Sequence, residues 1–395
     1  MKLSPRELAA VFVAAAVLTV AFVFAFNGAA APASGTFAAP APGTRPPVPA
    51  RPDSAVPAAE DGDAFPKIPT LPDFPALPPP VAAPEPVPAA PASAPALATV
   101  PAKAPRPAMK SFSCAGQICI DADTGEVLSA RNEHVRHPPA SVTKLMTIFL
   151  VLDAVDAGRL RLSSPVVASR RAQDMGGTQV NLAEGEMNTV DDLLYALMLQ
   201  SANDAAVALA EKVSGSVEKF VEEMNAKARE LSLARTTFST PHGLPMSKKE
   251  RAAGKVPDMT CAADLATLSR ALIMRHPQVF RYSARTGKVF REGRLGVKPL
   301  PMGNHNTLLR TFPGCDGLKT GWTNAGASIV TTASRGNRRV IAVVLGGIVP
   351  GAAKGSVDAR TSQRERDQRA AELMFDGLRR LDALKYAPTP VKTEN

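Results

Sequence analysis

The sequence is poor in cysteine, and its few cysteines form no pattern that indicates a metal or redox site. Four occur in 395 residues, none with C-x-x-C spacing: Cys114, Cys119, Cys261 and Cys315. They are too scattered for a disulfide framework, so we expect mostly buried apolar thiols, although an oxidising compartment would permit one bridge. The sequence also lacks the H-E-x-x-H motif of zinc peptidases and the G-x-S-x-G elbow of Ser-His-Asp hydrolases. We therefore expect neither a metal nor a cofactor.

Large apolar side chains are scarce between residues 32 and 110, where proline and alanine dominate. About 23 of the 37 prolines lie between Pro32 and Pro107. Such a segment buries too little surface to offset its ordering entropy, so we predict a disordered tether over residues 32–110. If extended at ~3.1 Å per residue, this tether would reach about 250 Å. A globular domain is predicted over residues 111–385, with a disordered tail at 386–395.

The N-terminus carries one long uncharged apolar run, from Leu8 to Phe26, preceded by Lys2 and Arg6. The run is just long enough to span a bilayer, and the basic residues before it should stay cytoplasmic. Residues 1–31 are therefore predicted to be a membrane anchor or a cleaved signal peptide, and both alternatives stay open. Either one places the domain in the periplasm, anchored to or secreted across the inner membrane.

Positive charge predominates, with a net charge of +10. The densest basic run is Arg281, Arg285, Lys288, Arg291, Arg294 and Lys298. We interpret this run as a solvated face or loop, with attraction to anionic wall or lipid surfaces as the alternative. No nucleic-acid motif accompanies it, so no nucleic-acid partner is expected.

Hydrophobic periodicity predicts strands, then helices, then strands and a final helix. A hairpin is expected over residues 115–130, turning at Asp121 to Gly125, and a buried helix over 141–155. Further helices are expected at 190–200, 204–213, 217–231 and 261–275, with Thr189, Ser216 and Thr260 as caps. Strands at 317–323, 325–334 and 338–349 precede an amphipathic helix at 359–384. This order predicts an α+β fold with an antiparallel sheet whose first and last elements meet.

Three short motifs indicate nucleophilic chemistry. They are S-V-T-K (Ser141 to Lys144), S-A-N (Ser201 to Asn203) and K-T-G (Lys319 to Gly321). A serine hydroxyl needs a base within hydrogen-bond reach, and the spacing from Ser141 to Lys144 puts both side chains on one helix face. Lys144 must be neutral near pH 7 to act as that base. The apolar helix would supply burial, and Lys319 would supply a neighbouring positive charge.

The other motif residues suit the remaining steps of an acyl transfer. Ser201 could relay a proton to the leaving group, and the Asn203 amide could hold a substrate amide. Lys319 and Thr320 suit a free carboxylate. Backbone N–H groups at helix and strand ends suit a developing oxyanion.

Two copies of these motifs are interpreted as coincidences. Ser216 to Lys219 reads S-V-E-K, but Ser216 follows Gly215 and opens an amphipathic helix, so it is predicted to be an N-cap. Arg285 to Gly287 reads R-T-G, but it lies in the basic run without a long apolar hairpin behind it.

Longer segments around the motifs resemble the low-molecular-mass penicillin-binding proteins of the D-alanyl-D-alanine carboxypeptidase type, serine peptidase family S11. The resemblance covers about residues 112–383. Its segments are D-A-D-T-G-E-V-L (Asp121 to Leu128), P-P-A-S-V-T-K-L-M-T (Pro138 to Thr147), S-A-N-D-A-A (Ser201 to Ala206), T-P-H-G-L (Thr240 to Leu244), N-H-N-T-L-L (Asn304 to Leu309) and G-L-K-T-G-W-T-N-A-G (Gly317 to Gly326). It implies a β-lactamase/transpeptidase-like fold with an all-helical subdomain.

The resemblance also implies roles for individual residues. Ser141 would form the acyl-enzyme, and Lys144 would accept its proton. Ser201 would serve proton transfer, while Asn203, Lys319, Thr320, Gly321 and Trp322 would bind substrate, with the backbone N–H groups of Ser141 and Trp322 as the oxyanion hole. The implied partners are a peptidoglycan stem peptide ending in D-Ala-D-Ala, β-lactams as covalent inhibitors, and the inner membrane through the N-terminal segment.

The expected activity is thus that of a serine-type D-Ala-D-Ala carboxypeptidase. The sequence leaves no room for a second β-rich domain after residue 385, which keeps a D,D-endopeptidase acting on cross-links open. A β-lactamase would need a group that activates the deacylating water, and none is identified. A silent wall-binding protein should have lost Ser141, Lys144 or Lys319, and all three are present. His242 and His305 are predicted to have loop or packing roles.

Overall fold

The computed structural model describes residues 111–351 and 356–385. The predictions for the N-terminal segment, the tether and the C-terminal tail therefore lie outside the described residues and stay predictions. Within the described ranges, no helix combines the length and the apolar character needed to cross a membrane.

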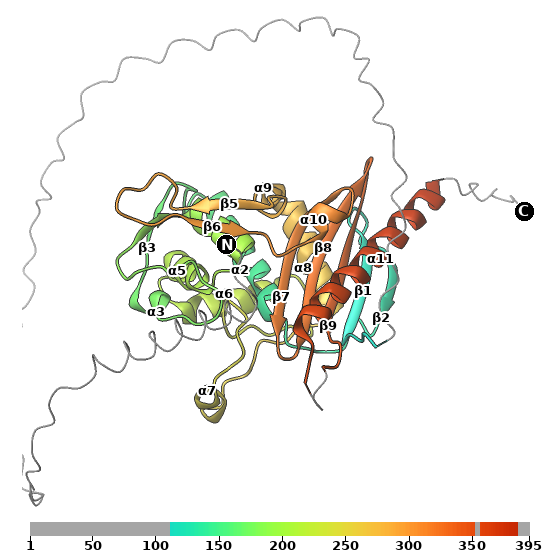
Figure 1. Cartoon of the computed structure of the whole chain (residues 1–395), viewed down its shortest axis with the longest axis horizontal. Coiled ribbons are helices and arrows are strands. Elements are labelled where there is room, and N and C mark those ends of the chain that lie inside the picture. Colours follow the sequence, from blue (N-terminus) through green and yellow to red (C-terminus); the bar gives the residue numbers. More distant parts are fainter. Residues whose placement is uncertain (1–110, 352–355, 386–395) are drawn as a thin grey trace, which may run out of the picture. The chain divides into compact units, whose positions relative to one another are not determined.

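A five-stranded antiparallel sheet forms the centre of the domain, in the order β2-β1-β9-β8-β7 (Figure 1). The strands are β1 (Gly116–Asp121), β2 (Val127–Arg131), β7 (Cys315–Thr323), β8 (Gly326–Arg335) and β9 (Arg338–Gly347). Strand β1 pairs with β9, from Gly116 opposite Leu345 to Asp121 opposite Val340. The predicted α+β class and the meeting of first and last strands are therefore confirmed.

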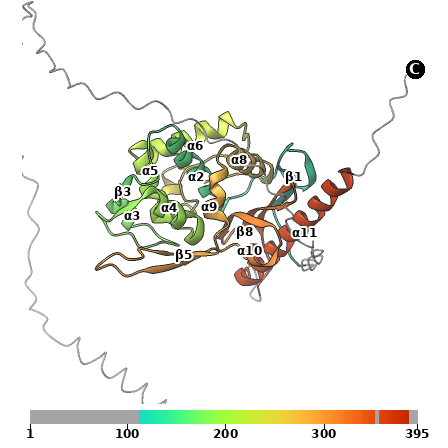
Figure 2. The same ribbon diagram turned by 90° about the horizontal axis from the view of Figure 1, so that it is seen from above.

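Alternation along β9 lets the sheet bury both of its faces. Ile341, Val343 and Leu345 belong to one core with the helical region, whereas Val340 and Val344 belong to a second core. Successive strand side chains point to opposite faces, so an uninterrupted apolar strand needs a cover on each side. Helix α11 (Ala359–Lys385) covers the second face, on the side of the sheet away from the other long helices (Figure 2).

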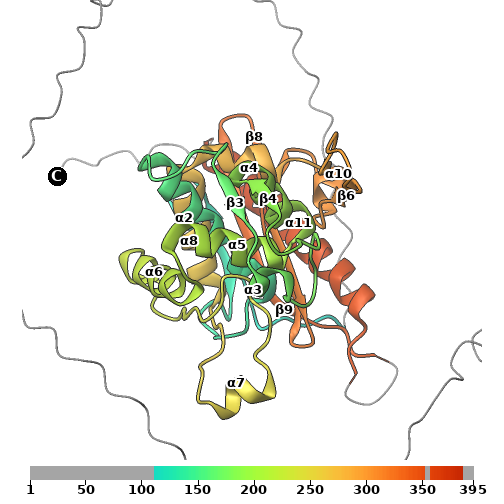
Figure 3. The ribbon, with the colours of Figure 1, turned by 90° about the vertical axis from the view of Figure 1, so that its left-hand side faces the viewer.

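The helical region packs on the opposite face of the sheet from α11, and the buried helix α2 (Lys144–Asp156) belongs to this region (Figure 3). The longer helices around it are α5 (Asn203–Ser214), α6 (Val217–Glu230) and α8 (Ala262–Arg275). Shorter helical segments are η1 (Ala140–Thr143), α3 (Arg170–Gln173), α4 (Val190–Tyr195), η2 (Ala196–Gln200), α7 (Lys248–Ala252), η3 (Pro277–Val279), α9 (Phe280–Ser283) and α10 (Leu308–Thr311). Two small antiparallel pairs complete the fold: β3 (Pro165–Val167) with β4 (Met187–Thr189), and β5 (Gly287–Phe290) with β6 (Leu300–Gly303).

Several details differ from the sequence predictions. Ser141 lies in the 3₁₀ segment η1 before α2, not in the α-helix itself. The helix predicted over 190–200 continues from α4 into a π-helical turn, η2. Strands β3 to β6 were missed because they are only three or four residues long. All four cysteines are free, and Cys114 and Cys315 are only partly buried.

Helix capping was predicted correctly at two of three positions. Thr189 accepts a hydrogen bond from the backbone N–H of Asp192, and Ser216 accepts one from Lys219. The third prediction is wrong, because Cys261 rather than Thr260 is the N-cap of α8. The Thr260 hydroxyl instead pairs with that of Thr236, 2.8 Å away.

Candidate active site

The three motifs meet at one cleft of about 370 Å³. Ser141 comes from η1, Ser201 from the turn after η2, and Thr320 from β7. The lining residues are Ser141, Thr178, Ser201, His305, Thr320, Gly321, Trp322, Gln363 and Arg366. The side chains of Lys144, Asn203 and Lys319 are buried around it. The fold thus joins three motifs that are far apart in the sequence, at residues 141–144, 201–203 and 319–321.

Lys144 has the geometry of a general base for Ser141. Its Nζ lies 3.0 Å from Ser141 Oγ, 2.7 Å from Asn203 Oδ1 and 2.8 Å from the His242 carbonyl oxygen. Its side chain has no exposed surface. Burial, and then the positive charge of Lys319, lower the pKa of Lys144 well below its ordinary value of 10.5. The predicted pairing and both predicted causes are therefore present in the structure.

Negative charge nearby limits this lowering of the Lys144 pKa. Asp204 and Asp258 both oppose it. Asp258 accepts hydrogen bonds from the backbone N–H of Ser239 and from the Thr240 hydroxyl, at 2.6 Å each. Burial nevertheless raises the pKa of Asp258 to about 6.

The loop after α6 contacts Lys144 and the helix that carries it, and the three motifs gave no indication of this loop. Thr147 donates to the Pro241 carbonyl, and Gly243 packs under η1. Gly243 has φ +79°, and a Cβ there would lie 2.0 Å from the Ala140 carbonyl oxygen, so only glycine fits. The atom of this loop that contacts Lys144 is the His242 main-chain carbonyl oxygen. The His242 ring accepts a hydrogen bond from Leu244, as its predicted loop role requires.

Ser201 lines the cleft, whereas Asn203 is hydrogen-bonded to Lys144. Ser201 has φ +60°, and its buried Oγ has no hydrogen-bond partner within residues 111–351 and 356–385. That hydroxyl is therefore free to bond a reacting group. Asn203 Oδ1 is occupied by Lys144, and Nδ2 donates to the Gly176 carbonyl at 2.8 Å. Nδ2 carries a second hydrogen, so the Asn203 amide keeps one donor besides the bond to Gly176.

Lys319 lies behind the cleft and Thr320 lines it. The Lys319 side chain is 1% exposed, and its Nζ donates to the Thr320 carbonyl at 2.9 Å. Burial, and then the charge of Arg366, lower the pKa of Lys319 to about 7. Gly321 allows β7 to approach η1, because a Cβ there would lie 3.0 Å from Ser141 N.

Arg366 and His305 are cleft residues that sequence reasoning did not assign. Arg366 comes from α11 and is 3% exposed; it pairs with Asp367 at 2.6 Å and donates to the Ser328 carbonyl at 3.2 Å. The sequence could not indicate that Arg366 is buried, because a buried arginine and a solvated one look alike in an amphipathic helix. His305 belongs to the loop between β6 and α10, as its predicted loop or packing role allows, and it also lines the cleft. No metal-binding group of three or more His, Cys, Asp or Glu side chains forms in the part of the chain that the structure describes.

Comparisons with known proteins relate the chain to D-alanyl-D-alanine carboxypeptidases. A family model described as D-alanyl-D-alanine carboxypeptidase matches residues 102–348. D-alanyl-D-alanine carboxypeptidase DacF of Bacillus subtilis is 38% identical over 234 residues, 59% of this chain and 57% of DacF. The chain thus spans less than two thirds of the length of that relative.

Two solved structures are similar in fold. One is the D-alanyl-D-alanine carboxypeptidase DacD from Francisella tularensis, with a TM-score of 0.59 and 28% identity, covering 69% of this chain and 72% of that one. The other is penicillin-binding protein D2 from Listeria monocytogenes in its ampicillin-bound form. Its TM-score is 0.56 at 30% identity, covering 67% of this chain and 97% of that one.

Proposed function

The chain belongs to the D-alanyl-D-alanine carboxypeptidase family, and we propose that it removes the terminal D-alanine of peptidoglycan stem peptides through an acyl-enzyme. One observation carries the proposal. A buried lysine whose pKa is lowered well below its ordinary value lies 3.0 Å from the hydroxyl of Ser141, which lines the cleft. A neutral amine at that distance can take the serine proton, which the chemistry of acyl transfer requires.

In the proposed acylation, Ser141 Oγ attacks the carbonyl carbon of the penultimate D-alanine while its proton passes to Lys144 Nζ. Backbone N–H groups of Ser141 and Trp322 would stabilise the oxyanion that forms. The C–N bond then breaks, and the departing D-alanine nitrogen receives a proton from Lys144 through the Ser201 hydroxyl. The products are an ester on Ser141 and free D-alanine.

Deacylation reverses the proton path. A water molecule attacks the ester carbonyl and gives a proton to Lys144, which returns it to Ser141 Oγ as the ester bond breaks. The shortened stem peptide leaves with a new carboxylate. The enzyme returns to its starting protonation state, so no external acid or base is consumed.

The terminal carboxylate of the substrate would lie at the positive end of the cleft. We propose that the Thr320 hydroxyl and Arg366 contact it, while Lys319 contributes charge from behind. Thr320 and Arg366 line the cleft, which supports this assignment. Charge-assisted hydrogen bonds of this kind contribute ~1.5 to 3 kcal/mol each.

A fluorescent penicillin tests the proposal. The Listeria protein was solved with ampicillin bound, and we propose that β-lactams acylate this chain at Ser141. The wild-type chain and Ser216→Ala should be labelled, and Ser141→Ala should not. Mass spectrometry of a disaccharide pentapeptide incubated with the chain should then show loss of one alanine, again only with Ser141 present. Labelling of Ser141→Ala equal to wild type would refute the nucleophile, and cleavage of a cross-linked dimer without alanine release would favour the endopeptidase.

We propose that the domain works in the periplasm. The apolar run from Leu8 to Phe26, preceded by Lys2 and Arg6, supports export, and the wall substrate lies in that compartment. Protease added to spheroplasts should digest the domain. Survival of the domain until the membrane is lysed would contradict this location.

A further inference from the structure

A loop between α3 and β4 forms one side of the cleft and holds Asn203 in place. We define residues 174–186 as the cleft loop. Thr178 of this loop lines the cleft, and its carbonyl accepts the backbone N–H of Asn203 at 2.8 Å. The Gly176 carbonyl accepts the side-chain amide of Asn203, also at 2.8 Å. The position of Asn203, which contacts Lys144, therefore depends on the path of this loop.

The inner side of the cleft loop is fixed by Asp204, next to Asn203 on α5. Its carboxylate accepts the backbone N–H groups of Val180, at 3.1 and 3.2 Å, and of Leu182, at 3.0 Å. Both atoms of the contact are buried, so the bonds are shielded from water. The loop is thus connected directly to the helix that begins at Asn203.

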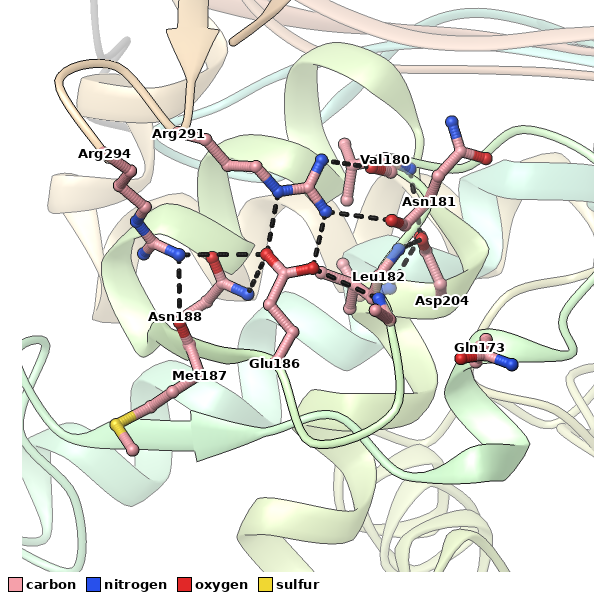
Figure 4. A network of polar contacts seen from close by, with 12 residues as sticks. Gln173, Val180, Asn181, Leu182, Glu186, Met187, Asn188, Asp204, Arg291 and Arg294 are labelled. Carbon is pink, nitrogen blue, oxygen red and sulfur yellow. Dashed lines mark hydrogen bonds and ion pairs between the residues drawn. The ribbon is translucent and has the colours of Figure 1, made fainter. Parts of the chain in front are cut away.

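The outer side of the same loop is held by Arg291, which follows strand β5. Its Nη1 donates to the Val180 carbonyl at 3.0 Å, and Nη2 donates to the Asn181 carbonyl at 2.9 Å (Figure 4). Nε and Nη2 bind the two carboxylate oxygens of Glu186 at 2.7 Å each. Val180 is therefore held from both sides, its N–H by Asp204 and its carbonyl by Arg291.

Glu186, a residue of the cleft loop, makes further hydrogen bonds besides those to Arg291. It also accepts the Ala183 backbone N–H at 3.1 Å and the Asn188 side-chain amide at 3.1 Å. Two guanidinium bonds to a carboxylate and two to carbonyls use the planar fork of arginine in a way that lysine cannot reproduce. The bonds thus depend on the guanidinium geometry as well as on its charge.

Arg291 differs from the rest of the basic run, which was interpreted as a solvated face. Its side chain is 8% exposed, against 51% for Arg281, 34% for Lys288 and 32% for Arg294. Arg291 also has φ +60°, a left-handed conformation that is unfavourable for a residue with a Cβ and persists only where the surroundings hold it. The prediction of a solvated side chain is therefore wrong for this residue, although it lies in a loop after β5.

We infer that Arg291 is a positioning residue, which fixes the cleft loop through Glu186, Val180 and Asn181 and so sets the place of Asn203 during acylation. The inference rests on the proposed function. Loss of the guanidinium would free the outer side of the loop while the bonds to Asp204 remain. Gly176 and Thr178 would then shift, and Asn203 would lose its alignment toward both Lys144 and the substrate.

The test measures penicillin acylation of the full chain at a series of penicillin concentrations. The variants are Arg291→Gln, Arg291→Lys and Glu186→Gln, with Arg170→Gln as the matched control. Arg170 pairs with Asp174 and with Glu184 of the same loop, but its side chain is 66% exposed. Active-site titration counts competent molecules separately from the rate constant of each.

We expect Arg291→Gln to lower the acylation rate constant per titrated site about ten- to a hundredfold, because small misplacements of substrate-positioning groups have effects of this size. Arg291→Lys should lie between Gln and wild type, and Arg170→Gln should match wild type. The double variant Arg291→Gln/Glu186→Gln should be no slower than Arg291→Gln alone, since the two residues act together.

Other results would overturn the inference. A purely structural role predicts fewer titratable sites and a lower melting temperature, with an unchanged rate constant per site in Arg291→Gln and Arg291→Lys. If Arg291→Gln fails to fold, Arg291→Lys and Glu186→Gln decide on the same criterion. A wild-type chain that penicillin does not acylate at all would refute the proposed function instead. Acylated wild type with equally fast Arg291 variants would refute only the positioning role.

Discussion

Gly321 lies between strand β7 and the backbone of Ser141, and its replacement by alanine tests how closely the two must fit. A Cβ at residue 321 would lie 3.0 Å from the Cβ of Ala140, 3.0 Å from Ser141 N and 3.1 Å from the Pro139 carbonyl oxygen. Non-bonded heavy atoms pack best at about 3.5 to 4.0 Å. The strand and the η1 segment would therefore have to separate by roughly 0.5 Å.

That displacement can be converted into a rate. Misplacing reacting groups by about 1 Å costs on the order of a hundredfold, so half of that distance corresponds to about 1.4 kcal/mol, or tenfold. The two backbone N–H groups proposed for the oxyanion lie on opposite sides of this contact, on Ser141 and Trp322. We therefore expect Gly321→Ala to slow acylation by penicillin about tenfold, with the chain still folded.

Stopped-flow acylation with a fluorescent penicillin would measure this effect. Gly303→Ala is the matched control, because a Cβ on that strand glycine would meet no atom within 4 Å. Equal rates for Gly321→Ala and wild type would refute the close approach as a requirement for acylation. An equal slowing in both glycine variants would show that the effect is not specific to the contact with η1.

Three further predictions concern charge and capping. The pKa of Lys319 is lowered to about 7, so its ammonium is present below that pH and lost above it. The rate of acylation by carboxylate-bearing penicillins should therefore fall by up to about tenfold per pH unit above 7. The Lys319→Arg variant should keep its rate over the same pH range, because a guanidinium stays protonated. Burial raises the pKa of Asp258 to about 6, above its ordinary value of 3.8. The protonated carboxyl therefore stabilises the fold fully below pH 3.8, and this stabilisation of roughly 3 kcal/mol is lost as the pH rises through 6. Urea unfolding at several pH values should show this decrease in the free energy of unfolding, and Asp258→Asn should lack it. Ser216→Ala should lower the free energy of unfolding by about 1 kcal/mol through loss of an N-cap, with acylation unchanged, and slower acylation would contradict the role of Ser216 as a cap alone.

Much of the fold could be predicted because local pattern and tertiary environment agree. The apolar run of β9 needed a cover on each face, and α8 and α11 supply one each. Helix α2 is apolar around most of its circumference and is buried accordingly. The prediction missed β3 to β6, since a strand of three or four residues carries too little periodicity to be recognised.

The contact between Ser141 and Lys144, the proposed nucleophile and base, could be predicted from spacing, because one helical turn brings the two side chains together wherever the helix lies. The groups that hold this pair could not be found in that way. The His242 contact uses a main-chain carbonyl, which residue identity does not distinguish from any other. Arg291 and Arg366 look like solvated cations in the sequence, and only packing against distant segments removes them from water. Residue order therefore indicated the atoms proposed to react, whereas long-range packing decided which carbonyls and charges surround them.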